Sequence, residues 1–256
     1  MIEVEHLRKE FKLTRRVRRE MGEDFRSATT ISAVDDVSFQ CAPGRVFGLI
    51  GPNGAGNTTV LRLIATMLRP TSGRITVAGF DTQTHPEKVR GQIGFMTGQT
   101  ALYDRLTPEE MIRYMADLHD MSRPDFVKSK EKLFSVLGMH EFARRRIARL
   151  SSGMKQKVSI ARTIIHDPDV VVFDEPTSGL DVMTSRAIMD LIRSCREGGK
   201  TVIFSTHRMG EVNLICDDVA IIHQGRLYFK GTLKGFESSM THETFEDEFV
   251  HLVGEA

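Results

Sequence analysis

The chain has 256 residues, 40% of them hydrophobic, which is enough to bury a sizeable core in one large domain or in a domain with a subdomain. A formal net charge of +1 excludes a strong overall field of the kind that attracts DNA, RNA or an anionic membrane. No apolar run approaches the roughly 18 residues that span a bilayer, and the N-terminus lacks the apolar core of a signal peptide, so secretion is not expected.

Strand-like and helical segments alternate through the first third of the chain, a pattern typical of an α/β domain around a largely parallel sheet. We expect strands at residues 2–4, 31–40 and 45–50, with an irregular polar stretch at 12–30 between the first two. A helix is expected to begin at Thr58 and to end before Pro70, because apolar residues recur on one face: Leu61, Ile64, Met67 and Leu68.

The middle third contains only helical signals. Thr107, Pro108 and Glu110 form a capping box with proline at the first helical position. Two further helices are expected at residues 126–137, ended by Gly138, and at 141–150. Because no strand lies among them, we expect a helical subdomain inserted between sheet elements at about residues 99–160. The apolar face of its first helix is predicted to consist of Met111, Ile112, Met115 and Leu118.

Alternation then resumes. The pattern predicts strands at 170–173, 201–205 and 219–222, a hairpin turn at Gln224 and Gly225, and helices at 182–195 and 245–253. We therefore expect one main domain over residues 1–232, followed by a short helical tail over 233–256. Three cysteines lie far apart in the sequence and are expected to be reduced and packed: Cys41, Cys195 and Cys216.

A glycine-rich stretch, GPNGAGNTT, follows the predicted strand at 45–50 and opens a helix. Such a strand–loop–helix aims backbone N–H groups and a helix N-terminus at one point, where phosphate oxygens bind. The hydroxyl of Thr58 is placed to bind Mg²⁺, but Asn57 stands where these loops need a lysine. At this point an ordinary glycine-rich turn remains the alternative. The candidate residues are Gly51, Pro52, Asn53, Gly54, Ala55, Gly56, Asn57, Thr58 and Thr59.

Two carboxylates, Asp174 and Glu175, end the predicted strand at 170–173. Ligands of parallel sheets gather at the carboxyl ends of strands, which is where the glycine loop also lies. Asp174 is thus a candidate to hold the Mg²⁺ of a nucleotide through water, and Glu175 to polarise a water for attack on the γ-phosphate. His207 follows another strand and is expected to reach the same crevice. A solvated strand end and a structural histidine are the alternatives.

The order of four motifs resembles the ATP-binding cassette of ABC transporters: GPNGAGNTT, LSSGMKQ, VVVFDEPTSGLD and STH. The resemblance extends from residue 2 to about residue 231. It implies an α/β P-loop NTPase fold with a mostly parallel core sheet, an antiparallel β subdomain and an inserted α-helical subdomain. It also implies binding of ATP with Mg²⁺ and a head-to-tail homodimer or heterodimer of cassettes that sandwiches two ATP molecules.

The resemblance assigns roles to further residues. Ser151 and Gly153 would contact the γ-phosphate of the nucleotide bound by the partner, Phe11 would stack on adenine, and Asp181 would lie at the dimer seam. His207 would act as the γ-phosphate switch. The family's glutamine before the helical insert aligns with Gly98, and Gln99, directly after it, is the candidate substitute.

Finer features resemble the sodium-efflux (NatA-like) subgroup: LSSGMKQKVSIAR, TGQTALYDRLTPEE and a short tail. Those ATPases pair with a separate transmembrane permease subunit, which implies a cytoplasmic location, peripheral on the inner face of the cell membrane. The ion is less specific, because related cassettes export drugs, lipids or polysaccharides.

Asn57 is the serious departure from the family. Asparagine is neutral and shorter than lysine, and losing one charge-assisted hydrogen bond costs about 1.5–3 kcal/mol, roughly ten- to a hundredfold in affinity. We therefore expect an ATP-hydrolysing motor subunit with weakened binding and turnover; the alternative is a regulatory or structural cassette with little hydrolysis. A third reading, a ribosome- or DNA-bound cassette using the basic run at 15–20, is disfavoured because acidic residues follow the run. No nucleic-acid partner is expected.

Overall fold

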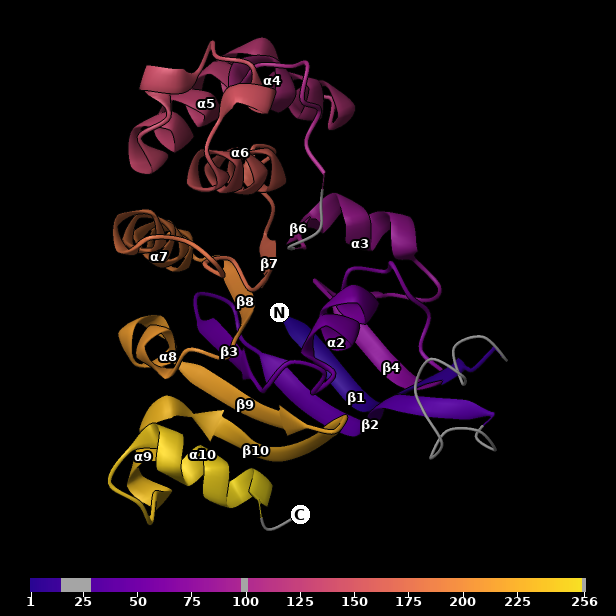
Figure 1. Cartoon of the computed structure of the whole chain (residues 1–256). Helices are drawn as coiled ribbons and strands as arrows, with labels where there is room; N and C mark the ends of the chain where they lie inside the picture. Colours follow the sequence, from indigo (N-terminus) through magenta and orange to yellow (C-terminus); the bar gives the residue numbers. More distant parts are fainter. Residues whose placement is uncertain (15–28, 98–100, 255–256) are drawn as a thin grey trace.

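The computed structural model describes residues 1–14, 29–97 and 101–254. Its centre is a six-stranded sheet in the order β10-β9-β3-β8-β7-β6 (Figure 1). All neighbours in this sheet are parallel except the outermost pair, β9 and β10. The expectation of a mostly parallel core sheet is therefore confirmed. Its strands are β3 (Val46–Ile50), β6 (Ile93–Met96), β7 (Val170–Asp174), β8 (Thr201–Thr206), β9 (Asp218–His223) and β10 (Arg226–Thr232).

A second sheet has four antiparallel strands in the order β2-β1-β4-β5. They are β1 (Ile2–Lys12), β2 (Thr30–Cys41), β4 (Ser72–Val77) and β5 (Phe80–Asp81). This sheet is the expected antiparallel β subdomain. The prediction that the first strand ends at residue 4 is wrong. The ladder has irregularities between Val4 and Leu7, and His6 has φ 47°, so the alternation of buried and exposed residues is interrupted although the strand continues.

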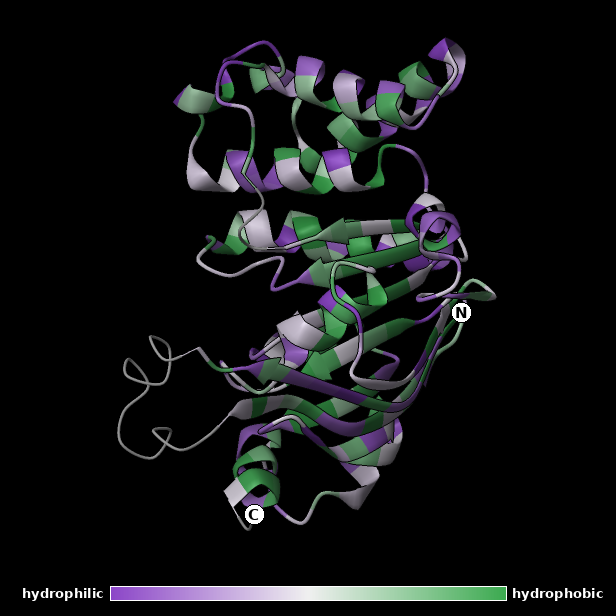
Figure 2. Ribbon diagram, turned by 90° about the vertical axis from the view of Figure 1, so that its right-hand side faces the viewer, coloured by the Kyte–Doolittle hydropathy of each residue, from purple (hydrophilic) through white to green (hydrophobic). Residues whose placement is uncertain are grey.

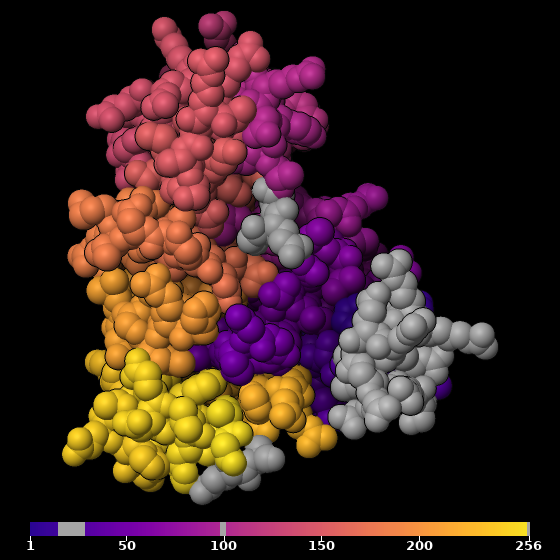
Figure 3. Space-filling view, viewed as in Figure 1, coloured from indigo at the N-terminus to yellow at the C-terminus, as the bar shows by residue number. Residues whose placement is uncertain are grey.

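Helices cover the faces of the core sheet (Figure 1). The helices from α4 to α6 form the upper part of the molecule in Figures 1 and 3. In chain order they are α2 (Asn57–Ile64), α3 (Pro86–Gln92), α4 (Pro108–Leu118), α5 (Arg123–Leu137), α6 (Ser152–Ile164), α7 (Val182–Glu197), α8 (Met209–Ile215), α9 (Leu233–Ser239) and α10 (Phe245–Gly254). Within the described ranges, no helix is both long and apolar enough to cross a membrane.

Two local predictions for the helical region are confirmed. Thr107 and Glu110 form the predicted capping box at the start of α4, and Gly138 ends α5 in the left-handed region with φ 60°. The helix expected at 141–150 is wrong, because this stretch contains two short 3₁₀ turns, His140–Phe142 and Ile147–Arg149. Two residues of the predicted apolar faces, Met67 and Leu118, are exposed.

The hydrophobic core lies on both faces of the six-stranded sheet, because consecutive side chains of a strand point to opposite sides. On β7, Val171 and Phe173 pack toward the helices from α4 to α8, whereas Val170 and Val172 pack toward α2 and the four-stranded sheet. Figure 2 shows the hydrophobic residues concentrated along these central strands. All three cysteines are buried and free, as expected.

Candidate nucleotide-binding site

The glycine-rich loop connects β3, which ends at Ile50, to α2, which begins at Asn57. Gly54 and Gly56 have φ angles of 84° and 114°, in the left-handed region that favours glycine. A Cβ atom on Gly51 would collide with the carbonyl oxygen of Ile222, so this position also requires glycine. The loop is therefore held in one shape by its neighbours. With three other segments it lines a pocket formed by Ala33, residues 51–59, Asp174, Glu175 and Ser205.

Asn57 is the first residue of α2 and only 9% exposed. Its amide Nδ2 lies 3.5 Å from the carbonyl oxygen of Gly51, which is the outer limit of a hydrogen bond. Its Oδ1 is buried and has no hydrogen-bond partner in the described part of the chain. The side chain thus lines the pocket at the glycine loop with one polar atom unsatisfied, and it supplies no positive charge.

Asp174 is buried at the end of β7, next to the loop, where two hydroxyls donate to its Oδ1. The Thr58 hydroxyl lies 3.1 Å away and the Ser205 hydroxyl 2.8 Å away. The two residues predicted to bind metal are therefore in direct contact. An uncharged hydroxyl oxygen beside a carboxylate is the ligand chemistry that Mg²⁺ prefers, so the residues present fit this ion.

Glu175 follows Asp174 and has φ 47°, which turns the chain sharply out of the sheet. Its backbone N–H donates to the Ser205 hydroxyl at 2.9 Å. Its Oε1 lies 3.2 Å from Nδ1 of His207, and both side chains are partly exposed. The two residues predicted to be catalytic are thus paired: Glu175 lines the pocket, and His207, which does not line it, lies in hydrogen-bond contact with the Glu175 carboxylate.

Ser205 is a site residue that sequence reasoning missed. In the parallel register, Asp174 lies opposite Ser205, and the serine hydroxyl connects Asp174 to the backbone of Glu175. The signal was present in the sequence, because Ser205 directly precedes Thr206 and His207 at a strand end. Its use required knowledge that β7 and β8 are neighbours.

Buried Glu211 is a second residue that the motifs did not reveal. Thr177, in the loop after β7, donates to one of its carboxylate oxygens at 2.6 Å. Thr206, at the end of β8, donates to the other at 2.8 Å. Arg208 also pairs with this carboxylate, at 2.9 Å. Glu211 therefore ties together the segments that carry Glu175 and His207.

The glycine loop is supported from outside by β2 and by the turn between β9 and β10. Gly225 donates its backbone N–H to the carbonyl oxygen of Ala55 at 2.8 Å. A Cβ atom on Gly56 would lie 2.6 Å from the carbonyl oxygen of Ala33, so β2 packs directly against the loop. These contacts are made by backbone atoms, which is why no side-chain motif indicated them.

Other predicted site residues do not line this pocket. Ser151 caps α6 through the Met154 N–H, and Asp181 caps α7 through the Thr184 N–H. Gly153 faces Thr184, where a Cβ atom on the glycine would lie 3.1 Å from its Oγ1, so these two helix starts are adjacent. Phe11 lies on β1, under the Lys9 ammonium. Gln99 and the basic run at 15–20 lie outside the described residues.

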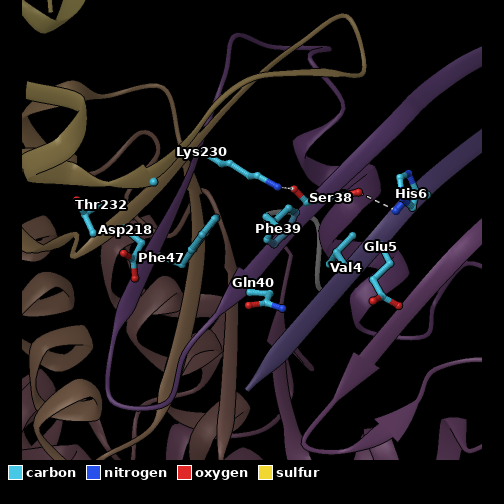
Figure 4. A pocket seen from close by; sticks show the side chains of 11 residues that line it. Val4, Glu5, His6, Ser38, Phe39, Gln40, Phe47, Asp218, Lys230 and Thr232 are labelled. Carbon is cyan, nitrogen blue, oxygen red and sulfur yellow. Dashed lines mark hydrogen bonds between the residues drawn. The ribbon is translucent and has the colours of Figure 1, made fainter. Parts of the chain in front are cut away.

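A larger hollow of about 620 Å³ lies between the four-stranded sheet and β10, against about 150 Å³ for the pocket at the glycine loop (Figure 4). Lys230 reaches across it to the carbonyl oxygen of Ser38 at 3.0 Å, and the Ser38 hydroxyl accepts the His6 backbone N–H at 2.8 Å. None of the residues predicted for the site lines this hollow. Size therefore does not identify the functional pocket, whereas the chemistry of its lining does.

A strand–glycine loop–helix at the carboxyl edge of a parallel sheet, beside a threonine–aspartate pair and a glutamate, defines a P-loop nucleotide-binding domain. The sequence profile of the ABC transporter family matches residues 34–178. The chain belongs to this family and is of the ATP-binding subunit type.

Three known proteins show how far the likeness extends. The chain is 43% identical over 214 residues to the ABC transporter ATP-binding protein NatA of Bacillus subtilis, covering 83% of this chain and 87% of that protein. It is 32% identical to the linearmycin resistance ATP-binding protein LnrL of Bacillus subtilis, covering 87% and 72%. A dimeric post-hydrolysis structure of the ATP-binding cassette MJ0796 with ADP and Pi superposes with a TM-score of 0.78 at 25% identity, covering 91% of this chain and 99% of that one.

Proposed function

We propose that this chain is the ATP-hydrolysing motor subunit of an exporter, with nucleotide affinity and turnover weakened by Asn57. The observation that carries this proposal is the assembly of Thr58, Asp174 and Glu175 at the glycine loop, with His207 in contact with Glu175. A glycine-rich turn with no function would not need two hydroxyl bonds to one aspartate oxygen and a glutamate–histidine pair beside it. Their placement matches the needs of phosphoryl transfer to water.

The backbone N–H groups of the loop and the N-terminus of α2 would hold the β- and γ-phosphates of ATP. Thr58 and Asp174 would hold Mg²⁺, which supplies charge neutralisation to these phosphates when it is bound. Glu175 would accept a proton from the attacking water through its carboxylate. His207, already within 3.2 Å of that carboxylate, would contact the γ-phosphate and hold Glu175 in place.

Asn57 sets the expected level of activity. The residues that line the pocket include no lysine, arginine or histidine, so none of these described side chains supplies the positive charge of the missing lysine. A lost charge-assisted hydrogen bond lowers affinity by about ten- to a hundredfold. Turnover falls further where the bond strengthens in the transition state. This same observation favours the second candidate function, a nucleotide-binding cassette that regulates a transporter with little hydrolysis.

A dimer of cassettes would complete each site. Ser151, Gly153 and Asp181 do not line the pocket of their own chain, which fits a role toward the nucleotide of a partner. Directly after Asp181, the apolar side chains of Val182 and Met183 are each 80% exposed. Apolar side chains exposed side by side favour an interface at the start of α7. The partner cassette would be a second copy or a related chain.

A separate transmembrane permease would complete the transporter, with this chain bound at the cytoplasmic face of the membrane. Sodium is the proposed cargo because of the similarity to NatA, and another small exported substrate is the alternative.

Three purified proteins test the proposal: the natural chain, Asn57→Lys, and Asn57→Lys with Glu175→Gln. We expect Asn57→Lys to bind Mg-ATP about ten- to a hundredfold more tightly than the natural chain and to hydrolyse it faster. The double variant should bind as tightly but lose hydrolysis, because only the carboxylate that accepts the proton is changed. Equilibrium binding of a fluorescent ATP analogue and release of phosphate measure the two properties.

Absence of nucleotide binding by Asn57→Lys would refute the motor proposal. Equal hydrolysis by the natural chain and Asn57→Lys, with the permease present, would refute only the effect assigned to Asn57. Tight binding without hydrolysis in both would favour the regulatory alternative.

A further inference from the structure

We propose that Asn57 and the backbone carbonyl of Gly51 form a binding site for a monovalent cation, which replaces the lysine ammonium against the phosphates of ATP. Because bound ATP supplies the remaining ligands, this inference rests on the function proposed above. The first observation is the unsatisfied Oδ1 of Asn57, buried in the phosphate cradle without a hydrogen-bond partner in the described ranges. Native proteins leave few buried polar atoms unpaired, and a bound ion that contacts the atom is one recognised reason for such an exception.

The second observation is the geometry of the Asn57 amide. Its Nδ2 is 3.5 Å from the Gly51 carbonyl oxygen, too long for a strong N–H···O bond. The terminal torsion of asparagine is soft and nearly two-fold, so a half-turn about it exchanges Nδ2 and Oδ1. In that orientation Oδ1 lies about 3.5 Å from the Gly51 oxygen, and Nδ2 takes the place of the atom that has no partner, where it can donate to a phosphate oxygen of bound ATP. Two carbonyl oxygens at this separation repel each other, unless a cation contacts both of them.

The third observation is the charge of the pocket. Its carboxylates, Asp174 and Glu175, already contact hydroxyls and His207, and no basic side chain is among its lining residues. A bound triphosphate therefore brings negative charge to a place where, apart from the Mg²⁺ proposed at Thr58 and Asp174, only the partial positive charge of the backbone opposes it. One cation between the phosphates and the two carbonyl oxygens supplies the charge that the missing lysine would carry.

The ligand set favours a monovalent ion over a second Mg²⁺. Asn57 and Gly51 offer only neutral carbonyl oxygens, the type of ligand that replaces the hydration shell of potassium in channels. Mg²⁺ gives up water reluctantly and binds through carboxylates, which are found at Asp174 instead. Potassium, sodium and ammonium are therefore the ions that this site would take. Ammonium also restores the chemical group that lysine carries.

The competing account needs no ion. In that account, Nδ2 of Asn57 donates directly to a phosphate oxygen, and nucleotide affinity depends on ionic strength but not on the identity of the cation.

The test uses the full chain with Mg²⁺ and the non-hydrolysable analogue AMP-PNP, at constant ionic strength. The affinity is measured by titration calorimetry in choline chloride and again after replacement of choline by potassium, sodium or ammonium. Choline is too large to contact two oxygens 3.5 Å apart together with a phosphate. We expect at least one small cation to raise the affinity of the natural chain about tenfold or more, the effect of one charge-assisted contact.

Two variants serve as controls. Asn57→Lys carries its own ammonium and should respond less than about twofold to the same exchange of salts, because its site is already filled. Asn57→Ala keeps the backbone cradle but lacks Oδ1, and its response should fall toward that of the lysine variant.

Several results would overturn the inference. A natural chain whose affinity is the same in choline and in every small cation has no such site, even where Asn57→Lys binds AMP-PNP tightly and the proposed function stands. An equal response in Asn57→Ala would place the cation elsewhere. Failure of both the natural chain and Asn57→Lys to bind AMP-PNP in any salt would instead remove the proposed function itself, and the cation site with it.

Discussion

The imidazole of His166 lies between the end of α6 and the start of β7 and stacks on that of His119, at the end of α4. The ring centroids are 3.7 Å apart and the planes differ by 3°. Both nitrogens of His166 are buried, and in the described ranges neither has a partner with full hydrogen-bond geometry, although the Ile93 backbone lies close enough to favour the charged form weakly. Burial lowers the pKa of His166 to about 4, and the charges of His119 and Lys200 act in the same direction. The Ile93 backbone and Asp167 oppose this effect only in part.

The magnitude follows from the difference between about 6.5 for a free histidine and about 4 here, which corresponds to roughly 3 kcal/mol. The folded pKa is below the unfolded one, so the unfolded chain binds the proton first as the pH falls. Stability that is complete above pH 6.5 is therefore lost progressively toward pH 4. The pKa of His119 is also lowered by burial, with Asp120 opposing, so this ring adds to the loss in the same direction.

His166→Phe tests this linkage, because phenylalanine keeps a flat ring against His119 but cannot be protonated. Urea unfolding of the natural chain and the variant, at several pH values from 7.5 to 4.5, gives the free energy of unfolding of each. We expect the natural chain to lose up to about 3 kcal/mol more than the variant over this range. Titrating carboxylates affect both proteins alike and cancel in the comparison. Parallel pH profiles would refute a buried, neutral His166.

Two further predictions concern stability. Ser205→Ala should lower the free energy of unfolding by about 1–3 kcal/mol, because it leaves Asp174 and the Glu175 N–H short of a buried partner. Ser205→Thr keeps the hydroxyl and should lose less stability in the same urea titration; equal losses would contradict the argument. Gly138→Ala should lower the free energy of unfolding by about 1 kcal/mol, since φ is 60° at this position. Thermal unfolding should show a smaller loss of stability for Gly138→Asn, because asparagine tolerates this conformation. Equal losses in the two variants would refute a backbone cause.

Local signals in the sequence predicted the structure correctly where it depends on contacts between neighbouring residues. The capping box at Thr107 and the glycine at 138 predicted the ends of two helices correctly, because each depends on contacts within one turn. The segment 141–150 failed for the opposite reason. Its backbone pairs with the loop before α4: Ile147 donates to Leu106, and Ala148 donates to Asp104. These hydrogen-bond partners lie some forty residues away in the chain, so the periodicity of the segment itself did not indicate them.

The candidate site shows the same division. Its motif residues were readable because phosphate chemistry requires particular side chains next to particular strands. Ser205 could be recognised only from the pairing of β7 with β8, and the support of Ala55 by Gly225 involves backbone atoms alone. Whether Asn57 retains a hydrogen-bond partner also depends on the folded loop, where the Gly51 carbonyl is the only acceptor recorded for its amide among the described residues.

The carboxylate of Glu211 acts as a brace between the segments that carry the glutamate and the histidine of the site. Since Thr177 and Thr206 are both fixed to it inside the protein, the spacing of Glu175 and His207 is set before any nucleotide enters. On the function proposed above, nucleotide binding would then need less of its free energy to arrange this pair. The part of the candidate site that depends on the fold is thus in place, whereas the positive charge that a lysine at position 57 would supply is absent from the residues that line the pocket.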